Sequence, residues 1–180
     1  MRMRCGLAAI CLLMGSALVL PAQQRHDPLT PSEVDALRDT AQMPEKRIKL
    51  LVDDAGARLT QIETLRSDPK LTQHEDIGQL RRLINDLAEI IDEIDDNLSV
   101  YDGRGADLRK PLHGVIDADN NFQQRLRTIR ETFPPEVVGK VNIELEDAND
   151  SITSSISSAQ SMLDKQNEEK GKEKAAKKSR

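Results

Sequence analysis

The chain has 180 residues, of which 37% are hydrophobic, 32% charged and 2% aromatic, and its formal net charge at pH 7 is −5. A chain of this length corresponds to a single domain with a modest core. Aromatic side chains commonly stack on bases and sugar rings, so their scarcity argues against single-stranded nucleic acid and carbohydrate ligands. Basic residues are concentrated near the C-terminus, which gives an acidic body with a basic end.

The first 22 residues have the features of a secretory signal peptide. Arg2 and Arg4 precede an apolar run from Leu7 to Leu20, and Leu20-Pro21-Ala22 is a suitable cleavage point. We therefore expect a signal peptide over 1–22 and a periplasmic or secreted mature chain. The alternative is an uncleaved segment that anchors the protein in the membrane, because the apolar stretch nearly reaches the length of a membrane span.

Residues 23–28 are interpreted as a linker that connects the leader to the domain. Both cysteines, Cys5 and Cys11, lie in the leader. The mature chain would therefore contain no thiol for a disulfide bond, a metal thiolate or nucleophilic catalysis.

Five helices are predicted after the linker, in chain order. Thr30-Pro31-Ser32-Glu33 is a typical helix start, because a Thr cap, a Pro at the first position and a Glu three residues after the cap each favour it. Apolar residues then recur at intervals of three and four. The predicted helices cover about 31–42, 44–66, 73–102, 106–133 and 135–164, and Pro111 indicates a late start or a kink in the fourth.

The third predicted helix carries the most regular apolar seam of the chain. Its members are Ile77, Leu80, Ile84, Leu87, Ile91, Ile94, Leu98 and Tyr101, and the flanking Leu83 and Ile90 widen it. A face of this width suits a bundle better than a two-stranded coiled coil. The predicted fold is all-α: an up-and-down antiparallel bundle of four long helices preceded by one short helix, over residues 29–164.

Residues 165–180 are rich in Lys, Glu and Ala and lack an apolar stripe. We expect this segment to be a basic, disordered tail that mainly aids solubility. Membrane contact is expected only through the leader or through this tail, since clustered Lys residues attract anionic lipid.

An acidic run on the third predicted helix could bind cations, but its heptad positions point outward and favour a solvated face. The run comprises Asp86, Glu89, Asp92, Glu93, Asp95, Asp96 and Asp102. The helix dipole disfavours acids at the end of this helix and bases at the start of the next. We therefore expect the acids to pair with Arg104, Arg109 and Lys110 across the hairpin.

Other polar residues were considered as sites. Asp117, Asp119 and Asn121 resemble the start of a calcium loop, but Phe122 stands where such a loop needs Gly. Asp119 also falls on the apolar seam of the fourth predicted helix, where it either fixes the helix register or faces solvent. That seam comprises Leu108, Leu112, Val115, Phe122, Leu126, Ile129 and Phe133. The histidines are separated in sequence (His26, His74 and His113), and the serines of 151–161 lack an adjacent base. We predict no catalytic, cofactor-binding or metal site and no enzymatic activity.

Two segments share the pattern Leu-Thr-x-x-Glu, namely Leu29–Glu33 and Leu71–Glu75. The pair resembles the repeated Leu-Thr-x-x-Gln motif of small, all-helical periplasmic chaperones of the Spy and CpxP type, with Glu in place of Gln in both copies. The resemblance implies a helical envelope protein that binds unfolded clients.

The sequence thus favours an exported, non-enzymatic bundle with a structural or protein-interaction role in the cell envelope. Its partner would be another protein or a second copy of the chain, and no nucleic acid is expected. The alternative is a periplasmic chaperone or stress adaptor.

Overall fold

The computed structural model describes residues 26–66 and 74–178, and every regular element in these two ranges is an α-helix. The helices are α1 (Pro31–Arg38), α2 (Pro44–Leu65), α3 (His74–Gly103), α4 (Arg109–Thr132) and α5 (Pro135–Lys178). The predicted all-α class, with one short helix and four long ones, is confirmed. Nowhere in the described ranges is a helix apolar enough over a sufficient length to cross a bilayer. The leader 1–22 and most of the second Leu-Thr-x-x-Glu segment lie outside these ranges.

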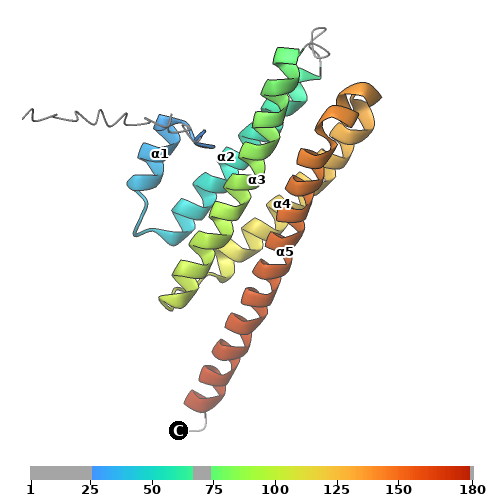
Figure 1. The fold of residues 1–180 in the computed structure, drawn as a ribbon. Helices are drawn as coiled ribbons and strands as arrows, with labels where there is room; N and C mark the ends of the chain where they lie inside the picture. The colour runs from blue at the N-terminus through green and yellow to red at the C-terminus, as the bar shows by residue number, and fades with distance from the viewer. Residues whose placement is uncertain (1–25, 67–73, 179–180) are drawn as a thin grey trace, which may run out of the picture.

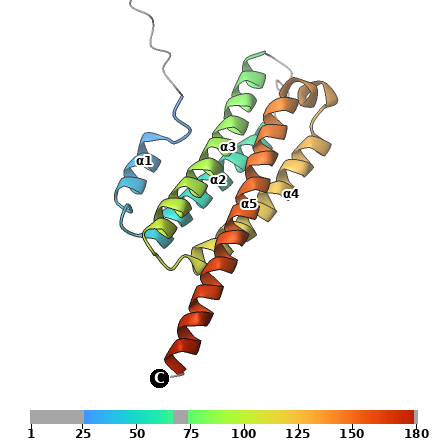
Figure 2. The ribbon, with the colours of Figure 1, turned by 60° about the horizontal axis from the view of Figure 1, so that its bottom comes forward.

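Helices α2 to α5 form a four-helix bundle built from two hairpins, as Figure 1 shows. Helix α2 packs against α3 and α4, while α5 packs against α3 and α4. Helices α3 and α4 are joined by a short loop, yet they make no direct contact and lie diagonally opposite each other. The diagonal places α3 beside α5 and α2 beside α4, and in each of these pairs the two helices run in the same direction (Figures 1 and 2).

The core consists of the apolar seams that the sequence predicted. All ten residues assigned to the seam and flank of α3 are buried, as are the seven expected on α4 and its flanks. The seam residues of α4 are Leu108, Leu112, Val115, Phe122, Leu126, Ile129 and Phe133. Burial of such residues drives the association of the four helices.

Helix α1 starts as the sequence indicated but ends earlier. Thr30 and Glu33 form a reciprocal capping box at its N-terminus. The helix ends at Arg38 instead of near Gln42. Arg47 of α2 donates to the Leu37 carbonyl oxygen at 2.8 Å, and the Thr40 hydroxyl donates to the same oxygen at 3.0 Å. These donors satisfy a carbonyl at the end of α1 and stabilise the turn that follows.

The connection between α3 and α4 depends on Gly105, which adopts a left-handed conformation with φ of 74°. The amide of Gly105 donates to the Asp102 carbonyl and the amide of Ala106 to the Tyr101 carbonyl, which is the Schellman arrangement at a helix end. Helix α4 then begins at Arg109. Pro111 lies in its first turn, where a missing N–H removes no helical hydrogen bond. The expected late start is therefore confirmed.

The first turns of α5 end at a break at Val141, whose φ of −125° and ψ of 16° are not helical. The break leaves the Lys140 carbonyl available, and Arg81 of α3 donates to it through Nε at 3.1 Å. In these first turns Val137 is buried and Val138 is only partly buried. At the other end of the seam Leu163 is buried and Met162 is partly buried.

Helix α5 continues to Lys178, whereas we expected disorder from residue 165. Lys, Glu and Ala have high helix propensity, and the ion pair between Lys172 and Glu168 has the helical i, i+4 spacing. Lys165 also pairs with Asp102 at 2.9 Å, so the start of the predicted tail is attached to the bundle.

Replacing Ile91 with Ala should lower the free energy of unfolding by roughly 2–5 kcal/mol, because Ile91 is fully buried in the α3 seam. Replacing its exposed neighbour Asp92 with Ala should change that energy by less than about 0.5 kcal/mol. Urea denaturation followed by circular dichroism measures both. Equal effects of the two substitutions would contradict the packing of α3.

Candidate functional site

A buried arginine joins the N-terminal segment to the bundle. Arg58 of α2 is only 4% exposed. Its Nη1 and Nη2 donate to the two carboxylate oxygens of Glu33 on α1, at 3.1 and 2.6 Å, and Nη2 also donates to the Pro28 carbonyl at 2.6 Å. Burial opposes ionisation of Glu33, but the hydrogen bonds from Arg58 and Thr30 hold its pKa below the usual value. The two-pronged contact fixes the orientation of α1.

Two further acids lie near this arginine. Asp86 of α3 has an oxygen 4.0 Å from Arg58 Nε, and its other oxygen is 3.1 Å from His26 Nε2. Burial raises the pKa of Asp86, and His26 and Arg58 oppose the rise. Burial, then repulsion by Glu33, raises the pKa of Asp54 to about 6. Carboxylates thus outnumber the single buried guanidinium in this cluster, and the whole arrangement holds residues 26–38 on α2 and α3.

A second polar feature lies inside the bundle and consists of Asp119 of α4, Ser155 of α5 and Asp95 of α3. We call these three residues the polar layer. Asp119 and Ser155 have no exposed surface, and Asp95 is partly buried. The Ser155 hydroxyl donates to Asp95 Oδ1 at 2.8 Å. Both carboxylate oxygens of Asp119 lack a hydrogen-bond partner.

Burial shifts the ionisation of both acids in the polar layer. It raises the pKa of Asp119 to about 7; the nearby Ser155 hydroxyl opposes the rise and the charge of Asp95 adds to it. Burial also raises the pKa of Asp95. The hydrogen bond from Ser155 opposes this rise, and repulsion by Asp92 and Asp96 adds to it. Desolvation disfavours the charged form of an acid, so this layer favours a bound proton.

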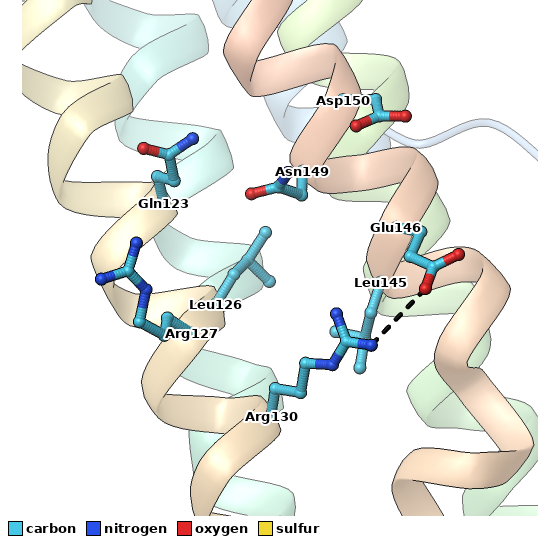
Figure 3. Close-up of a pocket in the computed structure, with 8 residues that line it drawn as sticks. All are labelled: Gln123, Leu126, Arg127, Arg130, Leu145, Glu146, Asn149 and Asp150. Atoms are coloured by element: carbon cyan, nitrogen blue, oxygen red, sulfur yellow. Dashed lines mark hydrogen bonds and ion pairs between the residues drawn. The ribbon is translucent and has the colours of Figure 1, made fainter.

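A groove of about 480 Å³ lies on the surface between α4 and α5, and Figure 3 shows its lining. Arg127 and Arg130 lie on the α4 wall and Glu146 and Asp150 on the α5 wall. The guanidinium of Arg130 is 3.4 Å from the carboxylate of Glu146. The groove therefore has a basic wall on α4 and an acidic wall on α5.

The expectation that the acidic run of α3 faces outward is wrong for Asp86 and Asp95. Asp86 lies beneath α1 and its preceding segment, and Asp95 turns toward Ser155. Both positions adjoin the apolar seam, so side chains from neighbouring elements cover them: His26 and Arg58 lie beside Asp86, and Ser155 lies beside Asp95.

The predicted pairing across the α3–α4 hairpin is also wrong. Asp102 pairs with Lys165 of α5, Lys110 with Glu45 of α2, and Arg109 with Asp107 of the loop itself. Arg104 lies over the Tyr101 ring at 6.0 Å. The physical reason is the diagonal placement of α3 and α4, which keeps their side chains apart.

The remaining candidates do not come together. Asp119 is buried while Asp117 and Asn121 are exposed, so these three do not form a loop around a cation. His26 and His113 are on separate elements, and the side chain of His74 lies outside the described part. Within 26–66 and 74–178 no three His, Cys, Asp or Glu side chains are grouped so as to hold a metal ion. Ser155 was not singled out, although its spacing from Ile152 and Ala159 places it on the α5 seam.

Comparison of the chain with models of known protein families, with curated proteins and with solved structures found no match.

Replacing Arg58 with Ala should destabilise the protein by about 3–5 kcal/mol, because it leaves the partly buried Glu33 and the buried Asp86 without the guanidinium. It should also speed amide hydrogen exchange across 31–38. Arg38, which pairs with Asp35 in solvent, is the matched control and should contribute less than about 1 kcal/mol. If exchange in α1 is unchanged by the Arg58 substitution, the cluster does not hold this helix.

Proposed function

We propose that this chain is an exported, non-enzymatic bundle protein that binds another protein in the cell envelope. The leader-like composition of 1–22 supports export, and the charged outer faces of a self-contained bundle support an interaction role. The polar layer has two acids and a hydroxyl, but it is closed to substrate by the helices around it. Protein binding therefore accounts for the structure better than catalysis.

The observation that carries this proposal is the length of α5, which has 44 residues. Gln166 closes the end of the bundle: its Nε2 donates to the Ala106 carbonyl at 3.0 Å, and its Oε1 accepts from the Leu108 amide at 2.9 Å. Lys170 pairs with Asp107 of the α3–α4 loop at 3.8 Å. The C-terminal end of α5 continues past the ends of the other helices, as Figures 1 and 2 show. We call residues 171–178 the basic arm.

Leu163 is the last buried apolar residue along the described part of α5. The side chains of Lys172, Lys174 and Lys177 in the basic arm are exposed. A short stretch at the end of a helix is only marginally stable in water by itself, so binding to a partner would stabilise the basic arm. Lys side chains favour acidic surfaces, and the expected partner is a protein with such a surface.

The alternative function, a chaperone for unfolded proteins, is favoured by one different observation. A groove of about 310 Å³ between α2 and α4 is lined mainly by the apolar Ile48, Val52, Pro111 and Val115. Met43, the residue before α2, is 53% exposed. It lines a shallow hollow together with Lys49, which also lines the apolar groove. An unfolded client binds through apolar segments, and a groove of this kind could receive one.

Photo-crosslinking in intact cells separates the two functions. A photoreactive residue at Lys174 should give one discrete adduct with a protein, whereas one at the exposed Asn121 of α4 should give none. A third probe at Lys49, beside the apolar groove, tests the chaperone alternative. Adducts with many proteins at Lys49 and none at Lys174 would contradict the proposal and favour the alternative.

The intact mass of the protein recovered from the producing cells tests export. If 1–22 is cleaved, the mass corresponds to a chain that starts at Gln23. Changing Leu12 and Leu13 to Asp should block export and leave the full-length mass, because the apolar run of the leader is interrupted. A full-length mass for the unaltered protein in the membrane fraction would instead support the uncleaved anchor.

A further inference from the structure

Asp119 is the one ionisable residue on the buried face of α4, where all other seam residues are apolar. It lies between Val115 and Phe122 at helical spacing and is fully buried. A buried polar group without a hydrogen bond is costly, and a buried carboxylate without a cation is costlier still. Neither of its oxygens has a partner.

The groups that face Asp119 offer no positive charge. Helix α3 presents Asp95, whose own negative charge opposes ionisation of Asp119. Helix α5 presents the neutral hydroxyl of Ser155. From α2, Gly56 lies near the ring of Phe122, and in the described part of α2 no charged group acts on Asp119. An ionised Asp119 would thus be unbalanced on every side.

We propose that Asp119 is a proton-binding site inside the bundle, in which a protonated Asp119 donates to Ser155 Oγ and Ser155 donates to Asp95. One proton then removes a buried charge and supplies the donor that the layer lacks. The hydrogen bond between Ser155 and Asp95 joins α5 to α3. The bond from a protonated Asp119 to Ser155 would add α4, and the proton would then be linked to the packing of α4, α5 and α3.

The donor set fits a proton better than a metal ion. Calcium takes six to eight oxygen ligands and magnesium six. The polar layer offers two carboxylates and one hydroxyl, and one carboxylate oxygen already accepts from that hydroxyl. A bound cation is nevertheless an outcome that the experiment distinguishes.

The sign of the pH dependence follows from the raised pKa of about 7. Between the ordinary pKa of an aspartate and this value, the folded chain binds one more proton at Asp119 than the unfolded chain does. The stabilisation that protonated Asp119 contributes is therefore full at pH values below the pKa of an aspartate in the unfolded chain. It decreases as the pH rises and levels off above about 7. The raised pKa values of Asp54, Asp86 and Asp95 act in the same direction, so the contribution of Asp119 must be measured by difference.

The first measurement is the melting temperature of the purified protein between about pH 5 and pH 8, with Asp119→Asn as the test variant. Asn keeps the shape and neutrality of a protonated Asp. The matched control is Asp117→Asn, two residues away and exposed. We expect Asp119→Asn to melt on the order of 5 °C above the unaltered protein at pH 8 and to show a smaller pH slope. Asp117→Asn should follow the unaltered protein.

An unchanged pH slope in Asp119→Asn would overturn the proposal. If that variant does not fold, carbon-13 NMR of the aspartate carboxyl groups in the unaltered protein decides the matter. A buried carboxyl that titrates near pH 7 supports the proposal, and the absence of any carboxyl titrating above about pH 5 overturns it. Stabilisation of the unaltered protein at pH 8 by calcium or magnesium alone, lost in Asp119→Asn, would show a cation in place of the proton and would also overturn it.

Discussion

The burial of the α3 seam between α2 and α5 is the constraint on which the rest of the structure depends. Its ten apolar residues fill the contact with both neighbours. Because this seam is directed toward α2 and α5, α4 must occupy the opposite corner. The loop at Gly105 therefore crosses the end of the bundle, and Gln166 of α5 satisfies its amide and carbonyl groups. The ion pairs of the molecule follow from this placement of the helices.

The same packing determines the surroundings of the two buried polar groups, Arg58 and Asp119. Arg58 neutralises acids brought in by α1 and α3, and it attaches a short helix that has little apolar surface of its own. Asp119 has no cation beside it, and we propose that a bound proton neutralises it instead. Buried polar groups commonly fix the register of helices at some expense of stability. Here Arg58 fixes the N-terminal segment, and a protonated Asp119, as proposed above, would link three long helices.

The helices and their core could be predicted from the sequence because the apolar spacing of α3 and α4 is almost uninterrupted. The capping box of α1 and the glycines after α3 also mark helix ends in the sequence. The pairing of acids with bases could not be. A short loop suggested that α3 and α4 are neighbours, and only the tertiary packing shows them on a diagonal. Asp119 could be placed on the seam but not inside the core, since the break at the start of α5 and the partners Ser155 and Asp95 are invisible in local spacing. The length of α5 was missed because its last turns lack an apolar stripe.

A disulfide crosslink tests the central claim, the adjacency of α3 and α5, most directly. A disulfide needs Cα atoms that lie close together. Asp95 of α3 and Ser155 of α5 meet this need, because their short side chains are joined by a hydrogen bond of 2.8 Å, and a chain from Gln23 contains no native cysteine. With cysteine at both positions, mild oxidation should form an intramolecular disulfide in the folded protein. The pair of cysteines at Asp102 and Arg109, which would lie close if α3 and α4 were neighbours, should remain reduced. Crosslinking of the second pair and not the first would contradict the diagonal arrangement and the account built on it.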